Sequence, residues 1–174
     1  MPTDLLTIDY LSNGSELQRK AYHTLLHSKI LYHLAPFQPV LTGTLPLDIF
    51  IEGKSDLDIV CCSSAFQPVE KILLLHFAAA TGFAIFEKNI RSVPTLLCRF
   101  QLDVFPVEIF CQHRPVTEQW AYRHLVVESR LLQKHGELFR REVMALKQQG
   151  VKTEPAFARL LGLPGDPYEA LLDL

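Results

Sequence analysis

Apolar residues recur at near-helical spacing through residues 15–34, as on one face of a helix. The apolar positions of this stretch are Leu17, Ala21, Leu25 and Ile30. Ser15, followed three residues later by Gln18, has the form of a capping box at a helix start. Pro36 and Pro39 cannot continue the helix. The pattern therefore predicts a helix over residues 15–34.

Short runs rich in β-branched and aromatic residues, bounded by turn residues, have the character of strands. They cover residues 39–43, 57–62, 83–90, 95–102 and 106–112. Residues 45–51, with the sequence LPLDIFI, lie between the first two runs and leave their secondary structure open. Helix-forming residues fill 65–81, with Pro68 in the first turn and Gly82 after the end. We therefore expect a helix between the second and third strands.

The last third of the chain has helical periodicity. Residues 117–135 and 137–149 predict two helices, each followed by a glycine. Two short helical turns follow, and the second is opened by Asp166 as cap and Pro167 as first helical residue.

The order of these elements is a helix, two strands, a helix, three strands and then helices, which predicts the α+β class with a small mixed β-sheet flanked by helices. A length of 174 residues fits one domain. We expect residues 1–115 to form the sheet core with its N-terminal helix. Residues 116–174 should add a C-terminal helical segment packed on that core within one compact domain.

Composition excludes several classes of protein. Hydrophobic residues make up 48% and charged residues 21%, as in ordinary globular proteins. The net charge of −2 argues against a broad basic surface for nucleic acid, although a local basic pocket remains open. The start lacks the pattern of a secretory signal, and no apolar run is long enough to span a membrane. Four cysteines without C-x-x-C spacing suit a reducing compartment, so we expect a cytoplasmic protein.

Two carboxylates one residue apart mark the second predicted strand. Side chains alternate between the faces of a strand, so Asp56 and Asp58 share one face, about 7 Å apart, while Leu57 faces the core. Bare carboxylates so close would repel, and burial would raise their pKa values. A hard divalent cation such as Mg²⁺ resolves this conflict, because it prefers carboxylate oxygens and keeps positions open for substrate phosphates. The alternative is a structural ion-pair site.

A third carboxylate repeats this arrangement in the last predicted strand, where Glu108 lies between two apolar residues. If that strand pairs beside Asp56 and Asp58, the three acids can hold two Mg²⁺ ions, or Mn²⁺ in their place, about 3.5 to 4 Å apart. That separation stabilises both the attacking and the leaving oxygens in phosphoryl chemistry. Asp103 is the competing third acid, but its place near a strand end favours a solvated turn, so we favour Glu108.

A Gly-Thr pair precedes the first acid, Asp56, with eleven residues between Thr44 and Asp56. Gly43 lets the backbone approach a ligand closely, and Thr44 offers a hydroxyl and an N–H. The turn that contains them is therefore a candidate for binding phosphate oxygens.

In this order and spacing, the motifs TGT, SDLDI and VEIF resemble the nucleotidyltransferase superfamily named for DNA polymerase beta. The resemblance implies a nucleotidyltransferase fold. It implies that Asp56, Asp58 and Glu108 form the metal and catalytic site, with Glu108 taking the acceptor's proton. It also implies that Gly43 and Thr44 hold the nucleotide phosphates.

From Leu41 to the C-terminus, runs such as GTLPLDI, EQWAYRHL and KTEPAFARLLGL resemble an uncharacterised bacterial family of nucleotidyltransferase-like proteins, a domain of unknown function. Two residues depart from the pattern of the superfamily. Thr44 stands where Gly or Ser is usual, and Pro46 is unusual in the helix that normally follows. We therefore expect an altered phosphate turn.

Four further residues are substrate-binding candidates. Ser55 directly precedes the acid motif, and Lys152 and Thr153 could supply a phosphate contact and a hydroxyl. For the last two, a solvated lysine and a helix cap are the favoured alternative. Arg123 would neutralise a triphosphate only if its helix face overlooks the acids, and would otherwise be a surface residue.

The apolar residues of the tail, from Val151 onward, are too many for a free segment and too few for a core of their own. We expect the tail to pack over the sheet domain and to close one wall of the cleft, which would fix the position of Lys152. A dimer contact is the alternative, and the oligomeric state stays open.

These features together predict a Mg²⁺-dependent enzyme that transfers a nucleoside monophosphate from a nucleoside triphosphate to an acceptor hydroxyl. The acceptor could be a small molecule, a protein side chain or an RNA end. The alternative is a non-catalytic nucleotide-binding or protein-interaction module that retains the fold.

Overall fold

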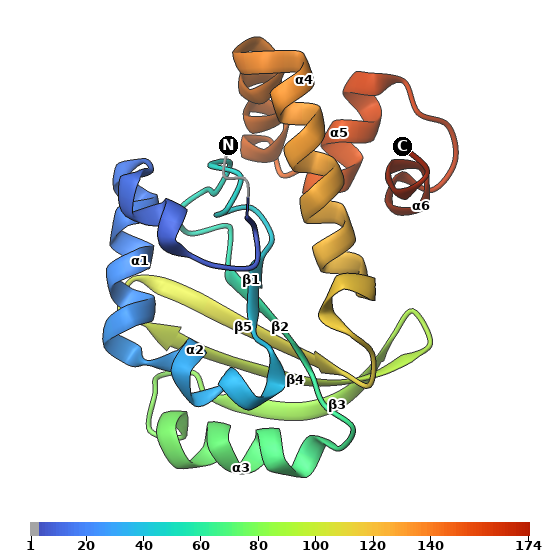
Figure 1. Ribbon diagram of the computed structural model, residues 1–174. Coiled ribbons are helices and arrows are strands. Elements are labelled where there is room, and N and C mark those ends of the chain that lie inside the picture. The colour runs from blue at the N-terminus through green and yellow to red at the C-terminus, as the bar shows by residue number, and fades with distance from the viewer. Residues whose placement is uncertain (1–3) are drawn as a thin grey trace.

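The computed structural model describes residues 4–174 and contains a five-stranded mixed sheet in the order β1-β2-β5-β4-β3 (Figure 1). The strands are β1 (Val40–Thr42), β2 (Leu57–Cys62), β3 (Ala84–Ile90), β4 (Val93–Leu102) and β5 (Phe105–Gln112). Strand β2 is parallel to β5, and the other neighbours are antiparallel. The predicted α+β class and the five predicted strands are confirmed.

The N-terminal helix begins as predicted but is broken once. Helix α1 (Glu16–Ser28) has the capping box, in which Gln18 N donates to Ser15 Oγ and Ser15 N donates to Gln18 Oε1. Lys29 has a left-handed φ of 55°, so a separate short helix, α2 (Ile30–His33), follows it. The prediction of one continuous helix was wrong at this residue, where neither glycine nor proline signals a break.

One hydrophobic core lies between the sheet and helices α1, α2 and α3 (Phe66–Phe77). These helices cover the face of the sheet to which Leu57, Ile59 and Ile109 point. The neighbouring residues Asp58 and Glu108 therefore point to the opposite face, since side chains alternate along a strand. That opposite face holds the site described below.

Three helices form the C-terminal part of the chain. They are α4 (Trp120–Gln148), α5 (Thr153–Leu161) and α6 (Pro167–Leu172), and a short 3-10 turn, η3 (Val116–Glu118), precedes them. Gly136 has non-helical backbone angles (φ 76°, ψ −163°), which divide α4 where the sequence predicts two helices. Asp166 caps α6 by accepting a hydrogen bond from Tyr168 N, with Pro167 in the first turn, as expected.

The tail packs mainly on α4. Helices α5 and α6 lie beside α4 (Figure 1). Phe157 and Leu171 are buried in a second hydrophobic core that these three helices share with Leu47 and Ile49. The tail therefore packs on the sheet domain at Leu47 and Ile49, although α4 is its main partner. The division of the chain at residue 115 stays a prediction.

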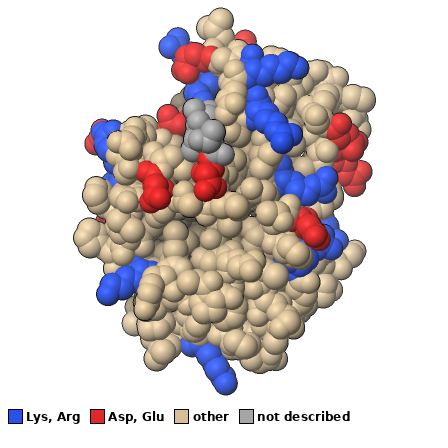
Figure 2. All heavy atoms as spheres, viewed as in Figure 1, with Lys and Arg blue, Asp and Glu red and all other residues tan. Residues whose placement is uncertain are grey.

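Three further observations concern the surface charges, the helices and the cysteines. Acidic and basic side chains are interspersed on the face seen in Figure 2. Among residues 4–174, no helix is long and apolar enough to cross a membrane. The four cysteines are free thiols, and three of them are buried in the core.

Candidate active site

The parallel pairing of β2 with β5 brings two acids together. In this register Asp58 is the partner of Glu108, and Leu57 is the partner of Val107. Asp56 lies one residue before β2 begins. The expected pairing of the Glu108 strand beside the Asp56 and Asp58 motif is confirmed.

A cleft of about 260 Å³ opens above these acids. It is bounded by the loops before β2 and by the connection from α4 to α5. Its walls are formed by Thr44, Ile51, Lys54, Ser55, Asp56, Asp58, Glu108, Lys147, Gly150, Val151, Lys152 and Thr153. Three lysines thus share one cleft with three acids, and the start of the tail forms one wall, as expected.

Gly43 contacts the carboxylate of Asp58 directly. A Cβ atom at Gly43 would lie 2.0 Å from Asp58 Oδ2, and the φ of +69° also disfavours a side chain. The hydroxyl of the next residue, Thr44, is buried and has no hydrogen-bond partner within residues 4–174. Residues 43–48 form successive turns with no helix, unlike the helix that the superfamily resemblance implies at this place.

The surroundings of Asp58 disfavour a negative charge on its carboxyl when no ligand is bound. Desolvation at the floor of the cleft, together with the nearby charges of Glu108 and Asp56, raises the pKa of the Asp58 carboxyl well above its usual value. The ammonium of Lys147 opposes this shift only in part. A cation bound beside Asp58 would favour the ionised carboxylate.

The side chains of Ser55 and Lys54 have structural partners at the rim of the cleft. Ser55 Oγ accepts a hydrogen bond from Ile51 N at 3.0 Å and closes the turn before β2. Lys54 Nζ donates to Gln148 O at 2.7 Å, which joins this turn to the end of α4. Both residues line the cleft, but these contacts occupy them in the protein alone.

A buried lysine lies at the opposite wall. Lys147 is only 7% exposed, and its Nζ donates to Thr153 Oγ1 at 3.1 Å. Burial lowers the pKa of Lys147 to about 8, although the acids Glu128, Glu154 and Asp58 raise it. Lys152, at the start of α5, is exposed beside it. Thr153 therefore binds Lys147 and also begins the helix.

Behind this wall lies a second buried acid. Glu128 on α4 is 3% exposed, and its Oε1 has no hydrogen-bond partner within residues 4–174. Desolvation and the charge of Glu154 raise the pKa of Glu128 well above its usual value, and Lys147 opposes the shift. His124 Nδ1 lies 3.9 Å from Glu154 Oε1, and His124 Nε2 lies 2.8 Å from Tyr168 O. A polar layer thus connects α4, α5 and α6.

A larger cavity of about 440 Å³ lies farther along the same sheet face, beyond Asp58 and Glu108. Its floor includes Val60 and Phe110, each two residues beyond one of these acids in its strand. Its walls include Trp120 and Tyr168, and the Arg91 guanidinium lies 4.3 Å and 5.0 Å from the centres of their rings. Thr153 lines the cleft and Glu154 lines the cavity, so the start of α5 separates the two.

Family membership follows from the sequence of most of the chain. The family described as "Domain of unknown function (DUF4269)" matches residues 23–174. The chain belongs to the DUF4269 family. No curated protein is similar enough in sequence to count as a relative.

Solved structures show the fold of this DUF4269 protein. The Cid1 poly(U) polymerase with MgGTP bound matches with a TM-score of 0.51 and 16% identity, over 75% of this chain and 40% of that one. The GLD-2/RNP-8 complex gives 0.52 and 17%, over 88% and 61%. The polymerase core of TRAMP, an RNA surveillance complex, gives 0.52 and 13%, over 94% and 50%. The fold is therefore that of nucleotidyltransferases, and the chain spans about half the length of these polymerases.

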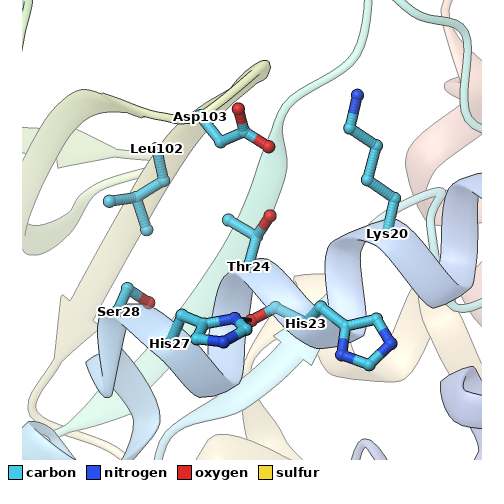
Figure 3. A pocket seen from close by; sticks show the side chains of 7 residues that line it. All are labelled: Lys20, His23, Thr24, His27, Ser28, Leu102 and Asp103. Atoms are coloured by element: carbon cyan, nitrogen blue, oxygen red, sulfur yellow. Dashed lines mark hydrogen bonds between the residues drawn. The ribbon is translucent and has the colours of Figure 1, made fainter.

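Two sequence-based candidates lie away from the cleft of the DUF4269 protein. Arg123 lines a separate depression with Arg130 and Leu172, so the condition for a phosphate contact is not met and Arg123 is the surface residue of the alternative. The reason is the position of each residue around the axis of α4, where the adjacent His124 faces inward and Arg123 faces the solvent. Asp103 is an exposed turn residue that lines a pocket against α1 (Figure 3). Glu108 is thus the acid adjacent to Asp58.

The sequence analysis missed Lys147, although a signal was present. Phe139, Val143 and Lys147 recur at intervals of four, which puts the lysine on the buried stripe of α4. A lysine in an apolar stripe is rarely without a partner. Lys54 had no such signal, because its contact depends on the approach of two distant segments.

Asp56, Asp58 and Glu108 line the same cleft but do not form a ready-made metal site. Within residues 4–174, no three His, Cys, Asp or Glu side chains converge closely enough for a ready-made metal site. The Oε1 atom of Glu108 is instead ion-paired with Arg99 Nε on β4.

Proposed function

We propose that this DUF4269 protein is a Mg²⁺-dependent nucleotidyltransferase that transfers a nucleoside monophosphate from a nucleoside triphosphate to an acceptor hydroxyl. The observation that carries the proposal is the pairing of Asp58 with Glu108 beneath a cleft that also contains Lys147 and Lys152. A metal–triphosphate presents positive charge to the acids and negative charge to the lysines. It therefore matches both walls of the cleft.

The residues of the cleft fit Mg²⁺ in three respects. The carboxylates of Asp56, Asp58 and Glu108 are the oxygen ligands that Mg²⁺ prefers. The raised pKa of Asp58 reflects a charge conflict that a bound cation relieves. Gly43 leaves room beside Asp58 Oδ2, and the buried hydroxyl of Thr44, which has no hydrogen-bond partner among residues 4–174, would bind a phosphate oxygen.

The transfer forms one bond and breaks one. The acceptor oxygen bonds to the α-phosphorus while the bond from that phosphorus to the oxygen bridging to the β-phosphorus breaks, and pyrophosphate leaves. Glu108 accepts the proton of the acceptor hydroxyl. Lys147 and Lys152 bind the pyrophosphate oxygens, with Lys147 held by Thr153. Asp56, Asp58 and Glu108 would hold Mg²⁺, which would supply positive charge to the phosphates, and catalysis would consist mainly of positioning and charge compensation.

The cavity of about 440 Å³ is the natural site for the nucleoside, because it adjoins the phosphate cleft on the same sheet face. Its apolar floor and the rings of Trp120 and Tyr168 suit a planar base, which gains from stacking on aromatic side chains. The nucleoside and the phosphates would then lie on either side of the start of α5.

A non-catalytic nucleotide-binding module is the second candidate. The observation that favours it is the segment after Gly43, where residues 43–48 form turns instead of the helix that the superfamily resemblance implies. A module of this kind would bind triphosphate without turnover. The retained pair of Asp58 and Glu108 opposes it, since repelling acids have little use in a site without a cation.

The first experiment compares thermal stability with and without Mn²⁺ or Mg²⁺ and triphosphate in the wild type and Asp58→Asn. The wild type should be stabilised by metal plus triphosphate, and the variant should not. In the second experiment the protein is incubated with cell extract and with labelled ATP, GTP, CTP or UTP, and pyrophosphate release is scored. Stabilisation without any pyrophosphate release would favour the non-catalytic binding module over the enzyme. The absence of metal-dependent stabilisation would rule out the proposed metal site.

A further inference from the structure

Arg99 on β4 lies against the third acid of the cleft. The antiparallel register of β4 and β5 pairs Arg99 with Glu108, so Glu108 lies between Asp58 on β2 and Arg99 on β4. Arg99 Nε forms an ion pair with Glu108 Oε1. The Arg99 side chain is 54% exposed and that of Glu108 is 18% exposed, so the guanidinium covers the acid from the solvent side.

This ion pair competes with the role proposed for Glu108. A carboxylate has two oxygens, and the guanidinium occupies one of them. A divalent cation at Glu108 would also be repelled by the adjacent Arg99 charge. Full use of Glu108 as a metal ligand and proton acceptor therefore requires Arg99 to move or to be neutralised by an anion.

The direction of the transfer decides which substrate meets Arg99. In phosphoryl transfer the attacking and leaving oxygens lie roughly in line. The lysines proposed to bind the leaving pyrophosphate, Lys147 and Lys152, line the cleft together with the acids. Arg99 does not line that cleft and lies across Glu108 from Asp58. The acceptor, which must enter opposite the pyrophosphate, therefore approaches Glu108 past Arg99.

The surroundings of Arg99 suit an anionic acceptor. Within residues 4–174 its ion pair is made through Nε, which leaves the two terminal guanidinium nitrogens for another anion. A guanidinium binds phosphate oxygens through two parallel hydrogen bonds. Phe86 on β3 faces the same side of the sheet, 40% exposed, with its ring centre 5.9 Å from Arg99 Cζ. Lys88, two residues farther along β3, is exposed on that side as well.

We propose that Arg99 recognises the acceptor through a phosphate group close to the reacting hydroxyl. In the free protein Arg99 holds Glu108, and the acceptor phosphate draws the guanidinium away, which releases Glu108 for metal binding and proton transfer. The phosphate can belong to a phosphorylated small molecule or to the terminal nucleotide of an oligonucleotide. This inference rests on the proposed function, because it assigns the acceptor side of the same site.

The proposal predicts that phosphate and metal bind cooperatively, and that the coupling depends on Arg99. Mn²⁺ affinity is measured by electron paramagnetic resonance of the free ion, with protein-free titrations to correct for Mn²⁺ bound by the probe. The probes are glycerol 3-phosphate, glycerol, and a 5′-phosphorylated dinucleotide. In the wild type, a phosphate probe should tighten Mn²⁺ binding about fivefold or more, and glycerol should not.

Arg99→Gln should bind Mn²⁺ more tightly than the wild type without any probe, and the phosphate probes should then have no further effect. Arg99→Lys keeps the charge but not the paired donors, so its coupling should be intermediate. Arg130→Gln, at an exposed arginine of α4, is the matched control and should behave as the wild type. Lys152→Ala tests whether the phosphate probe acts instead through the lysines of the cleft. If the coupling between phosphate and Mn²⁺ is lost in Lys152→Ala and retained in Arg99→Gln, the proposal is overturned.

The remaining outcomes are also decisive. Coupling by both phosphate probes supports the proposal and assigns a small phosphorylated acceptor. Coupling by the dinucleotide alone also supports the proposal and assigns a nucleic-acid end. Mn²⁺ binding without coupling by either probe overturns the inference and leaves the proposed function intact. Mn²⁺ binding that is absent, or unaffected by Asp58→Asn, overturns the proposed function and this inference with it.

Discussion

Lys147 Nζ donates a hydrogen bond to Thr153 Oγ1 at 3.1 Å and thereby joins the end of α4 to the start of α5. The two residues face each other across the short connection that forms one wall of the cleft. This contact orients an ammonium that burial would otherwise make costly. The phosphate-binding wall thus depends on the packing of the tail against α4.

Triphosphate binding should weaken as the pH rises through about 8, which is the pKa of Lys147. Deprotonation removes one positive charge from the cleft, and the loss of ammonium should reach about tenfold per pH unit at high pH. Lys147→Arg keeps its charge throughout this range and should flatten the profile. The measurement is the dissociation constant of triphosphate between pH 7 and pH 10. A wild-type profile as flat as that of Lys147→Arg would contradict the assignment.

The same group predicts the opposite trend for stability. The pKa of Lys147 is lower in the folded protein than its unfolded value of about 10.4. Between pH 8 and 10 the unfolded chain therefore binds more protons at this residue, and its contribution to the free energy of unfolding rises with pH. Lys147→Met should lack this rise in urea denaturation, whereas Lys134→Met, at an exposed position of α4, should retain it.

Asp58→Asn should stabilise the metal-free protein near neutral pH. The pKa of Asp58 is raised in the folded state, so its contribution to stability is present in full below the unfolded pKa of about 3.9 and is lost as the pH rises toward the folded value. Asparagine keeps the shape without this loss. Thermal melts at pH 7 should give a higher midpoint for the variant without metal, and no gain on adding Mn²⁺. A lower midpoint would mean that the carboxylate is already compensated.

The strand residues of the site could be predicted because strand alternation is a local property. Asp58 and Glu108 lie between apolar residues in their strands, so their common face follows once the strands are parallel neighbours. It was harder to predict which helical residues face the core. Arg123 and His124 are adjacent in sequence but about 100° apart around α4, and the direction of the helix axis relative to the sheet decides which one faces the core.

Other parts of the site depend on distant contacts that no local pattern contains. The Arg99–Glu108 ion pair follows from the register of β4 and β5, which the length of their turn determines. Lys54 reaches Gln148 O only because the turn before β2 lies beside the end of α4. Lys29 breaks the N-terminal helix without a glycine or proline, so its left-handed conformation carries no signal in the sequence.

Lys152→Ala should weaken triphosphate binding about tenfold and leave the melting temperature unchanged, because the side chain is exposed at the rim of the cleft. Arg123→Ala is the matched control, since Arg123 lines a different depression. Binding is measured calorimetrically with Mg²⁺ and triphosphate. If the two variants bind triphosphate equally well, Lys152 has no part in the site.

Gly43→Ala should disrupt the site at its centre. The added Cβ atom would lie 2.0 Å from Asp58 Oδ2, and a φ of +69° is strained for any residue with a side chain. Gly53→Ala is the matched control, because Gly53 has a φ of +74° but no atom within 4 Å of the added Cβ. In urea denaturation the control should lose about 1–2 kcal/mol, and Gly43→Ala should lose about 2 kcal/mol more together with Mn²⁺ binding. Equal losses in the two variants would show that Gly43 serves only the turn.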